Sequence, residues 1–358
     1  AGARHRRFRG ALSTRSTGDA AALPGRDRTY VQAGVNLNPR SDRKIPVVVL
    51  CGPTASGKTG LACSLAENFD LEVVSDDSRQ IYRKMDIGTA KPTAEERAVV
   101  PHHLLDVVDP DDDFSVADYV DLAGRAISEI DRQGRVPFVV GGTALYIRAL
   151  TDGLADTPTG DETLRRRLQQ DEQEMGEGTL YRRLQSVDPE QAAKIHPNNL
   201  VRIIRALEVF ESTGIPLSQF QQRHRFADEP YRVLKIYLTP PRAKLYQRIE
   251  TRVDAMLAAG LVDEVRSLLA AGYDPSLKSM KAIGYREVAS FLSGVIEYDE
   301  TVELIKRETR RYAKRQETWF KKEKSIISVD SSREIDKIQP SIECFLLQKG
   351  SGYGQDTI

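Results

Sequence analysis

The segment that most constrains the fold of this chain reads Gly52-Pro53-Thr54-Ala55-Ser56-Gly57-Lys58-Thr59. It matches G-x-x-x-x-G-K-[ST], the P-loop that cradles phosphates. An apolar run of the buried-strand type, Ile45 to Leu50, precedes it, and a helical pattern from Leu61 to Phe69 follows it. The strand–loop–helix context predicts an α/β fold, a P-loop NTPase-like core in which helices flank a parallel β-sheet.

The residue types in this segment suit an anion. Gly52 and Gly57 let the backbone turn sharply and bring its N–H groups close to a ligand. The following helix directs its positive end to the same place, and Lys58 adds a full charge. The Thr59 hydroxyl is placed to ligate Mg²⁺. The alternative is a glycine-rich turn without a ligand, and the motif alone leaves open which phosphate compound binds and whether a phosphoryl group moves.

Composition limits the partners. The chain has 358 residues and a formal net charge of zero, so a nucleic acid would have to meet a local basic surface. Its three cysteines, Cys51, Cys63 and Cys344, have no zinc-ligand spacing and indicate a reducing compartment. No apolar run approaches the roughly 20 residues of a membrane helix, and we expect no membrane association.

The chain divides by composition into several parts. Residues 1–44 are rich in Arg and Ser, and a transit peptide, a disordered arm and non-native sequence are all compatible with them. We expect a disordered extension without a catalytic role. We assign 45–155 and 232–330 to the P-loop core, 156–231 to an all-helical insertion domain, and 331–358 to a carboxyl-terminal tail.

Two further strand ends carry polar groups. Leu71 to Val74 predicts a strand, and the acidic pair Asp76 and Asp77 follows it. Ligands of open α/β sheets bind at the carboxyl ends of strands, so a carboxylate there lies near the phosphate site. The alternative is that one of the two aspartates caps the next helix.

The strand predicted from Val136 to Val140 ends in Gly141, Gly142 and Thr143. Many P-loop NTPases carry an aspartate after such a strand. Two glycines instead permit close approach of a ligand, and Thr143 offers a hydroxyl, although a simple tight turn would read the same way.

Some charged stretches have ordinary interpretations. His102 and His103 lack a third ligand at a supporting spacing, which favours a structural role. The run Asp109 to Asp113 reads as a solvated loop before a helix that starts at Ser115. The last long helix carries two basic rows with interleaved aromatic residues between Lys306 and Phe320, which suits either a phosphate backbone or plain solvation.

Taken together, ordered motifs between Val47 and Phe320 resemble the transfer RNA dimethylallyltransferase (isopentenyltransferase) family. The matching segments are GPTASGKT, DSRQIYRKMDIGTAKP, PHHLLD, GGTALY, HPNNLVRIIRALEV, TGIPLS, LTPPRAKLYQRI, RVDAML, AIGYRE and TRRYAKRQETWF. The resemblance implies transfer of a dimethylallyl group from its diphosphate to N6 of an adenosine next to the anticodon, with release of diphosphate.

The resemblance also implies roles for particular residues. Asp77 matches the general base, Thr143 a threonine near the reacting amine, and Lys58 a group that stabilises the leaving diphosphate. Arg252 matches an arginine at the diphosphate, and Arg248 and Arg286 are weaker candidates. Mg²⁺ is the implied cofactor.

The implied partners are dimethylallyl diphosphate and the anticodon stem-loop of tRNA, whose target base must leave its stack. The matching tRNA contacts are Asp77, Ser78, Arg79, Gln80, Thr143, Arg166, Val201, Arg202, Ile203, Ile204 and Arg205. Cys344 alone near the carboxyl end follows the bacterial pattern without a zinc finger. We expect a cytoplasmic monomer, with organelle targeting by residues 1–44 left open.

Three alternatives remain at this stage. A related prenyltransferase acts on free adenine nucleotide, although the insertion and the basic last helix favour a large RNA. A small-molecule kinase would share the P-loop, but the glycines after Val140 replace the usual acid. A non-catalytic RNA-binding module would not need a complete P-loop beside Asp77.

Overall fold

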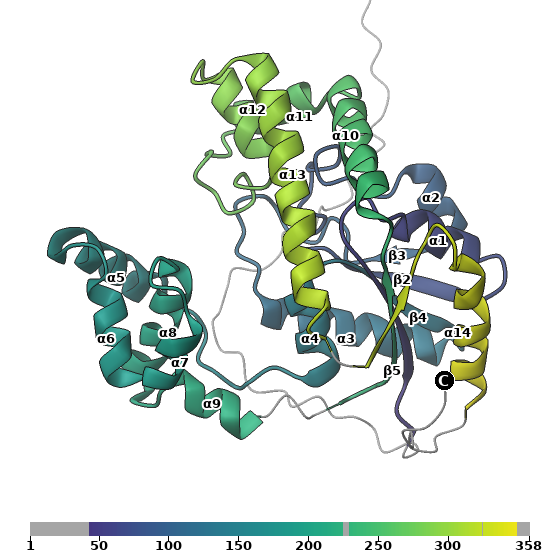
Figure 1. Cartoon of the computed structure of the whole chain (residues 1–358), viewed down its shortest axis with the longest axis horizontal. Helices are drawn as coiled ribbons and strands as arrows, with labels where there is room; N and C mark the ends of the chain where they lie inside the picture. The colour runs from purple at the N-terminus through teal and green to yellow at the C-terminus, as the bar shows by residue number, and fades with distance from the viewer. Residues whose placement is uncertain (1–42, 225–228, 324, 349–358) are drawn as a thin grey trace, which may run out of the picture. The chain divides into compact units, whose positions relative to one another are not determined.

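A computed structural model describes residues 43–224, 229–323 and 325–348, so the predicted extension lies almost wholly outside the described residues. Within them, six strands form one sheet in the order β3-β2-β4-β1-β5-β6, and every pair of neighbours is parallel (Figure 1). The strands are β1 (Pro46–Cys51), β2 (Leu71–Asp76), β3 (His102–His103), β4 (Val136–Gly141), β5 (Arg232–Leu238) and β6 (Ile326–Val329).

Helices connect these strands, and some precede β5 in the chain while others follow it. Those before β5 are α1 (Lys58–Leu65), α2 (Ala94–Val99), α3 (Val116–Arg132), α4 (Ala144–Asp152), α5 (Glu162–Met175), α6 (Thr179–Val187), α7 (Pro189–Lys194), α8 (Leu200–Thr213) and α9 (Leu217–His224). Those after β5 are α10 (Arg242–Ala258), α11 (Leu261–Ala270), α12 (Tyr285–Leu292), α13 (Tyr298–Phe320) and α14 (Ile338–Leu347).

Both faces of the sheet are buried. Alternate residues of β1 point to opposite sides: Val47 and Val49 join a core with residues of α3, α4 and α13, whereas Val48 and Leu50 join a core with α1 and α14. A strand covered on both faces reads as a continuous apolar run, which is why β1 was recognisable from sequence. The predicted parallel sheet flanked by helices is confirmed.

Helix α14 departs from the predicted tail over 331–358. Its Ile338, Ile342 and Phe345 are buried against the α1 side of the sheet. Their spacing places them on one helical face, a short amphipathic pattern that composition alone did not separate from a tail. Residues 349–358 lie outside the described part of the chain.

Residues at the ends of two helices have the types that helix termini favour. Ser115 caps α3 and forms a reciprocal capping box with Asp118, as the solvated loop before it predicted. Gly214 ends α8 with a φ of 70°, in the left-handed region that favours glycine. A capping hydrogen bond favours Ser115 and a left-handed backbone conformation favours Gly214. Both requirements are local, so the sequence carries the signal.

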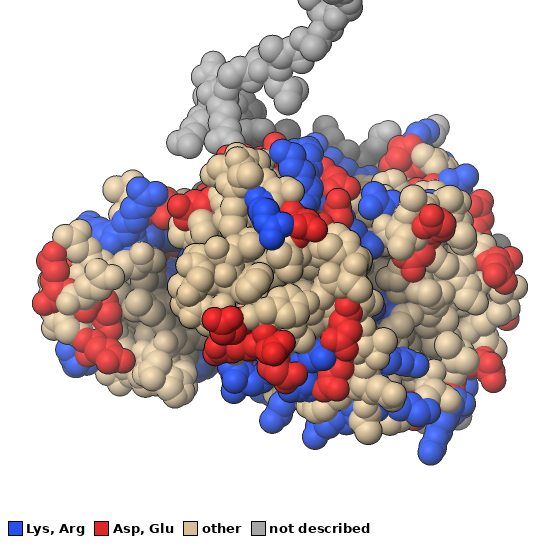
Figure 2. Space-filling view, turned by 90° about the horizontal axis from the view of Figure 1, so that it is seen from above, with Lys and Arg blue, Asp and Glu red and all other residues tan. Residues whose placement is uncertain are grey.

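Helices α5 to α9 have a core of their own, which includes Leu168, Leu184, Ile203 and Leu207. They correspond to the helical stretch predicted between residues 156 and 231. No helix in the described ranges is both long and apolar enough to cross a membrane. On the face seen in Figure 2, basic and acidic side chains are interspersed, in keeping with the formal net charge of zero.

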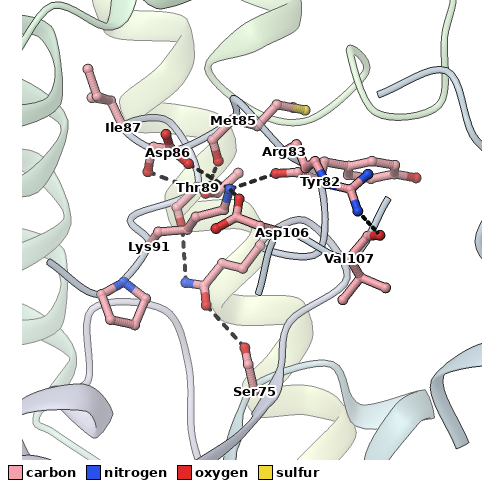
Figure 3. Close-up of polar contacts among 12 residues, drawn as sticks. Ser75, Tyr82, Arg83, Met85, Asp86, Ile87, Thr89, Lys91, Asp106 and Val107 are labelled. Atoms are coloured by element: carbon pink, nitrogen blue, oxygen red, sulfur yellow. Dashed lines mark hydrogen bonds and ion pairs between the residues drawn. The ribbon is translucent and has the colours of Figure 1, made fainter. Parts of the chain in front are cut away.

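The irregular segment after β2 is fixed by internal polar contacts (Figure 3). Gln80 accepts a hydrogen bond from the Ser75 hydroxyl at 3.2 Å and donates to the carbonyls of Thr89 and Ala90 at 3.1 Å. The Lys91 side chain is 1% exposed. Its Nζ lies 2.6 Å from the Tyr82 carbonyl and from one carboxylate oxygen each of Asp86 and Asp106 (Figure 3).

Helix α11 holds the same segment from the other side. Glu264 accepts hydrogen bonds from the amides of Asp86, Ile87 and Gly88 at 3.0, 2.8 and 3.2 Å, and from the Tyr285 hydroxyl at 2.5 Å. A carboxylate that satisfies three consecutive amides holds the loop rigidly. The segment after Asp77 is therefore fixed at both ends.

Replacing Lys91 with methionine should lower the free energy of unfolding by about 2 kcal/mol, because the Tyr82 carbonyl and two partly exposed carboxylates lose their shared cation. Urea unfolding followed by circular dichroism measures the change. Lys244→Met, on the exposed side of α10, is the matched control and should change stability by less than about 0.5 kcal/mol. Equal effects of the two substitutions would contradict the assigned role of Lys91.

Candidate active site

The P-loop connects the end of β1 to the start of α1. Gly57 has a φ of 96° immediately before α1, a conformation that a residue with a side chain rarely adopts. The Lys58 side chain curls over the loop, and its Nζ donates hydrogen bonds to the carbonyls of Gly52 at 3.0 Å and Pro53 at 2.9 Å. The predicted strand–loop–helix geometry is therefore present.

Positive charge gathers at this loop, and the acidic side chains of Asp76 and Asp77 lie at the neighbouring strand end. Burial, and after it the charge of Arg252, lowers the pKa of Lys58 to about 8. Burial also lowers the pKa of Arg252, which projects from α10. Arg248, one turn earlier, donates to the Ser56 carbonyl at 3.5 Å. Two cations that disfavour each other's charge are stabilised by an anion, so the site is suited to a phosphate group.

Helices α10 and α13 pack directly on the loop. Ala55 is buried in a small cluster with Leu245 and Ile249 of α10 and Ala313 of α13. Two ion pairs hold these helices together, Lys306 with Asp254 at 2.7 Å and Arg310 with Glu250 at 2.6 Å. The loop therefore has a fixed support far along the chain.

Gln316 is a site residue that sequence analysis missed. It is 7% exposed; its Oε1 accepts from the Thr54 amide and its Nε2 donates to the Gly142 carbonyl, both at 2.9 Å. The available signal was positional. Gln316 shares the buried face of α13 with Ala313 and Phe320, so it is a polar residue within an apolar stripe.

The acidic pair lies at the end of β2, next to the end of β4. The backbone amides of Arg79 and Gln80 donate to Oδ1 of Asp77 at 2.8 and 3.4 Å, and Oδ2 has no partner among the described residues. Thr143 accepts a hydrogen bond from the Ser78 amide at 3.2 Å. The structure thus brings Asp77 and Thr143 together, and the Lys58 charge acts on the Asp77 carboxylate.

Asp76 and Asp77 differ in exposure. Asp76 is fully buried; its Oδ2 accepts from the Thr143 amide at 2.9 Å, and its Oδ1 has no partner in the described ranges. Burial raises the pKa of Asp76 well above its usual range and also raises that of Asp77. Asp77 is half-buried and keeps one oxygen free, so it is the acid of the two that a substrate could reach.

The remaining residues predicted to touch RNA near the core have internal partners. Arg79 donates from NH1 to the Lys278 carbonyl at 2.8 Å. The side-chain carboxamide of Gln80 makes the hydrogen bonds to Ser75, Thr89 and Ala90 described above. Ser78 is half-buried and contributes its amide to Thr143. Only part of this segment is therefore available to a large ligand.

On α8 the predicted residues separate into two sets. Val201 is 80% exposed and Arg202 is exposed, whereas Ile203 and Ile204 are 1% and 4% exposed and lie in the core of the insertion. Arg205 pairs with Glu208 at 2.5 Å. The sequence motif did not separate the buried face from the exposed face, because consecutive residues of an amphipathic helix point to both faces.

The other basic candidates also separate by their partners. Arg166 of α5 is largely exposed and lies 3.4 Å from Glu162. Arg286 pairs with Glu287 of the same helix. On α13, where Lys306 and Arg310 are paired with α10, an open groove of about 400 Å³ remains, lined by Arg311, Lys314, Arg315, Thr318, Trp319 and Lys322.

The described residues contain no group of three or more His, Cys, Asp or Glu side chains that could hold a metal ion. His102 contacts the Val100 carbonyl at 2.8 Å and His103 contacts Glu72 at 2.5 Å. The Thr59 hydroxyl, at the start of α1, has no hydrogen-bond partner among the described residues. A cation at this site would therefore depend on ligands that a phosphate compound brings.

Comparison with known proteins agrees with this geometry. The family model described as IPP transferase matches residues 80–323, and that described as isopentenyl transferase matches residues 45–106. tRNA dimethylallyltransferase 1 of Pelobacter propionicus is 59% identical over 281 residues, 78% of this chain and 91% of that protein. tRNA dimethylallyltransferase of Geobacter metallireducens is 53% identical over 308 residues, 86% of this chain and 99% of that protein.

Solved structures give the same result. The tRNA isopentenylpyrophosphate transferase of Bacillus halodurans is 42% identical with a TM-score of 0.63, covering 85% of this chain and 97% of that one. A eukaryotic dimethylallyltransferase acting on tRNA is 30% identical with a TM-score of 0.71, covering 83% and 78%. The P-loop, the acidic edge beside it and these relationships establish that the chain belongs to the tRNA dimethylallyltransferase (IPP transferase) family.

Proposed function

We propose that this enzyme transfers the dimethylallyl group of dimethylallyl diphosphate to N6 of an adenosine adjacent to the anticodon of tRNA and releases diphosphate. The observation that carries the proposal is the unengaged Oδ2 of Asp77 beside a P-loop where Lys58 and Arg252 bring two positive charges together. This pairing suits alkyl transfer, because it supplies a proton acceptor and a site for an anionic leaving group together.

The proposed donor site consists of the P-loop, Gly52 to Thr59, with Lys58 and Arg252. Their positive charge stabilises the charge that develops on the leaving diphosphate. Mg²⁺, held by the diphosphate oxygens and Thr59, would add to that charge when bound. Arg248 reaches the loop carbonyl of Ser56 and is a second-choice contact.

In the proposed reaction, the bond between the allylic carbon and oxygen breaks, and a bond from that carbon to N6 forms. The N6 proton passes to Oδ2 of Asp77, while the amides on Oδ1 keep the carboxylate oriented. We assign to Thr143, whose hydroxyl accepts from the Ser78 amide, a contact with the reacting amine or the prenyl group.

We assign RNA contacts to exposed residues of three regions: the segment after Asp77, the insertion and α13. Val201 and Arg202 on α8, and Arg166 on α5, are the exposed members of the predicted set. The α13 groove combines cations with the partly exposed Trp319, which suits phosphates together with an unstacked base. Ile203, Ile204 and Arg205 instead support the fold of the insertion.

The enzyme is proposed to act as a monomer. Its relatives are named as bacterial enzymes of tRNA, which supports a cytoplasmic location. Residues 45–106 also match the isopentenyl transferase model. Free adenine nucleotide is therefore the alternative substrate that the assay below includes.

The proposal is tested by incubating the protein with Mg²⁺, dimethylallyl diphosphate and an anticodon stem-loop that has adenosine next to the anticodon. Mass analysis of the digested RNA should show one added dimethylallyl group on that adenosine. Alkylation of AMP but not of the stem-loop would support the free-nucleotide alternative instead. Transfer of phosphate from ATP without any alkylation would support a kinase.

Asp77→Asn should lower kcat by about 100-fold or more, because the N6 proton loses its acceptor. The affinity for the stem-loop should stay nearly unchanged, since the amide oxygen still accepts from residues 79 and 80. The raised pKa of Asp77 predicts that wild-type kcat is retained above that pKa and falls as pH drops through it. Asp111→Asn, on an exposed loop, is the control; an Asp77 variant with wild-type turnover would remove the base assignment.

Arg202→Ala should weaken stem-loop binding and reduce the slope of log K against log salt by roughly 0.7, the loss of one phosphate contact. Fluorescence anisotropy at several salt concentrations gives both quantities. Arg125→Ala, in an exposed ion pair on α3, should leave the slope unchanged. The same slope for wild type and Arg202→Ala would return Arg202 to a solvated face without an RNA contact.

A further inference from the structure

The two halves of the proposed reaction centre come from separate parts of the chain. The P-loop follows β1, whereas Thr143 follows β4 and Asp77 follows β2. Alkyl transfer requires the allylic carbon and N6 to be held in line, so the donor loop and the acceptor edge must keep a fixed relative position. A contact that joins them directly would therefore affect turnover more than binding.

Gln316 makes that contact. It reaches from α13 to the Thr54 amide in the donor loop and to the Gly142 carbonyl at the acceptor edge, across 262 and 174 residues of sequence. Gly142 precedes Thr143, which is held in turn by Asp76 and by the Ser78 amide. Hydrogen bonds on either side of the Gly142–Thr143 peptide bond thus connect the P-loop to the residue after Asp77.

The chemistry of the side chain is specific. One terminus must accept from an N–H and the other must donate to a carbonyl, and a carboxamide of this length does both. Glycine at position 142 is also required, because a Cβ there would lie 2.4 Å from Gln316 Nε2 and 2.9 Å from the Gly52 carbonyl oxygen. The Gly142 position therefore serves close packing of the protein against itself.

We propose that Gln316 is a positioning residue that couples the donor loop to the acceptor edge. The inference rests on the proposed function and goes beyond it, since Gln316 belongs neither to the P-loop nor to the proposed proton acceptor. Both ends of its carboxamide are engaged within the protein. It acts through Thr54 and Gly142, and it connects the reaction centre to the helix that carries the α13 groove.

Gln316→Met, which keeps the length and lacks the amide, tests the inference. We expect kcat to fall by about 10-fold to 100-fold, the effect of a small misplacement of reacting groups. KM for dimethylallyl diphosphate and for the stem-loop should change by less than about threefold, because the charged contacts remain. The thermal unfolding midpoint reports whether the variant is folded at the assay temperature. Gln339→Met is the matched control and should behave as wild type, because the half-buried Gln339 donates to Glu343 within α14.

Gln316→Glu supplies a readout that a purely structural role would not move. An ionised carboxylate accepts from Thr54 but repels the Gly142 carbonyl, whereas a protonated carboxyl both donates and accepts. The ratio of variant to wild-type kcat should therefore rise as pH falls, while the ratio for Gln316→Met stays constant. The Gln316→Met ratio is the reference for the titration of Asp77, which all three enzymes contain.

Wild-type alkylation in the same assay reports the proposed function, and the variant ratios report the coupling, so the two can fail separately. A Gln316→Met enzyme with kcat within threefold of wild type would overturn the inference. So would a loss of kcat that only matches the loss of folded protein, or a Gln316→Glu ratio that does not change with pH.

Discussion

The structure depends on holding positive charge in a loop where that charge is unfavourable by itself. Burial, and after it the charge of Arg252, lowers the pKa of Lys58 to about 8. Such a site is stable because α10 and α13 pack on the loop through Ala55 and are tied to each other by ion pairs. The energetic cost of gathering the cations is offset when an anion arrives, and the site is prepared for that anion before it binds.

Strand order converts this anion site into a site for a two-substrate reaction. β4 lies between β1 and β2, so the carboxyl ends of three parallel strands place Thr143 between the P-loop and Asp77. The hydrogen bonds of Asp76, Ser78 and Gln316 then fix these ends to one another. In this arrangement a P-loop serves as a holder for a leaving diphosphate, and the neighbouring acid accepts a proton from the incoming amine.

Features set by local chemistry could be predicted, and features set by distant packing could not. The P-loop, the strand before it and the Ser115 cap each depend on a few adjacent residues, and the structure contains all of them. Gln316 and the ion pairs of α13 depend on partners more than 50 residues away. The motif on α8 carried buried and exposed residues together, so Ile203 and Arg202 could be separated only by the helix that presents them.

The central claim is that carbon, and not phosphorus, is transferred from a diphosphate held by the P-loop. Dimethylallyl diphosphate labelled with ¹⁸O at the oxygen between carbon and phosphorus tests this most directly. Cleavage between carbon and oxygen predicts that all of the label leaves with the diphosphate and that the alkylated RNA contains none. Label that stays with the prenyl carbon, or phosphate that becomes attached to an acceptor, would contradict it.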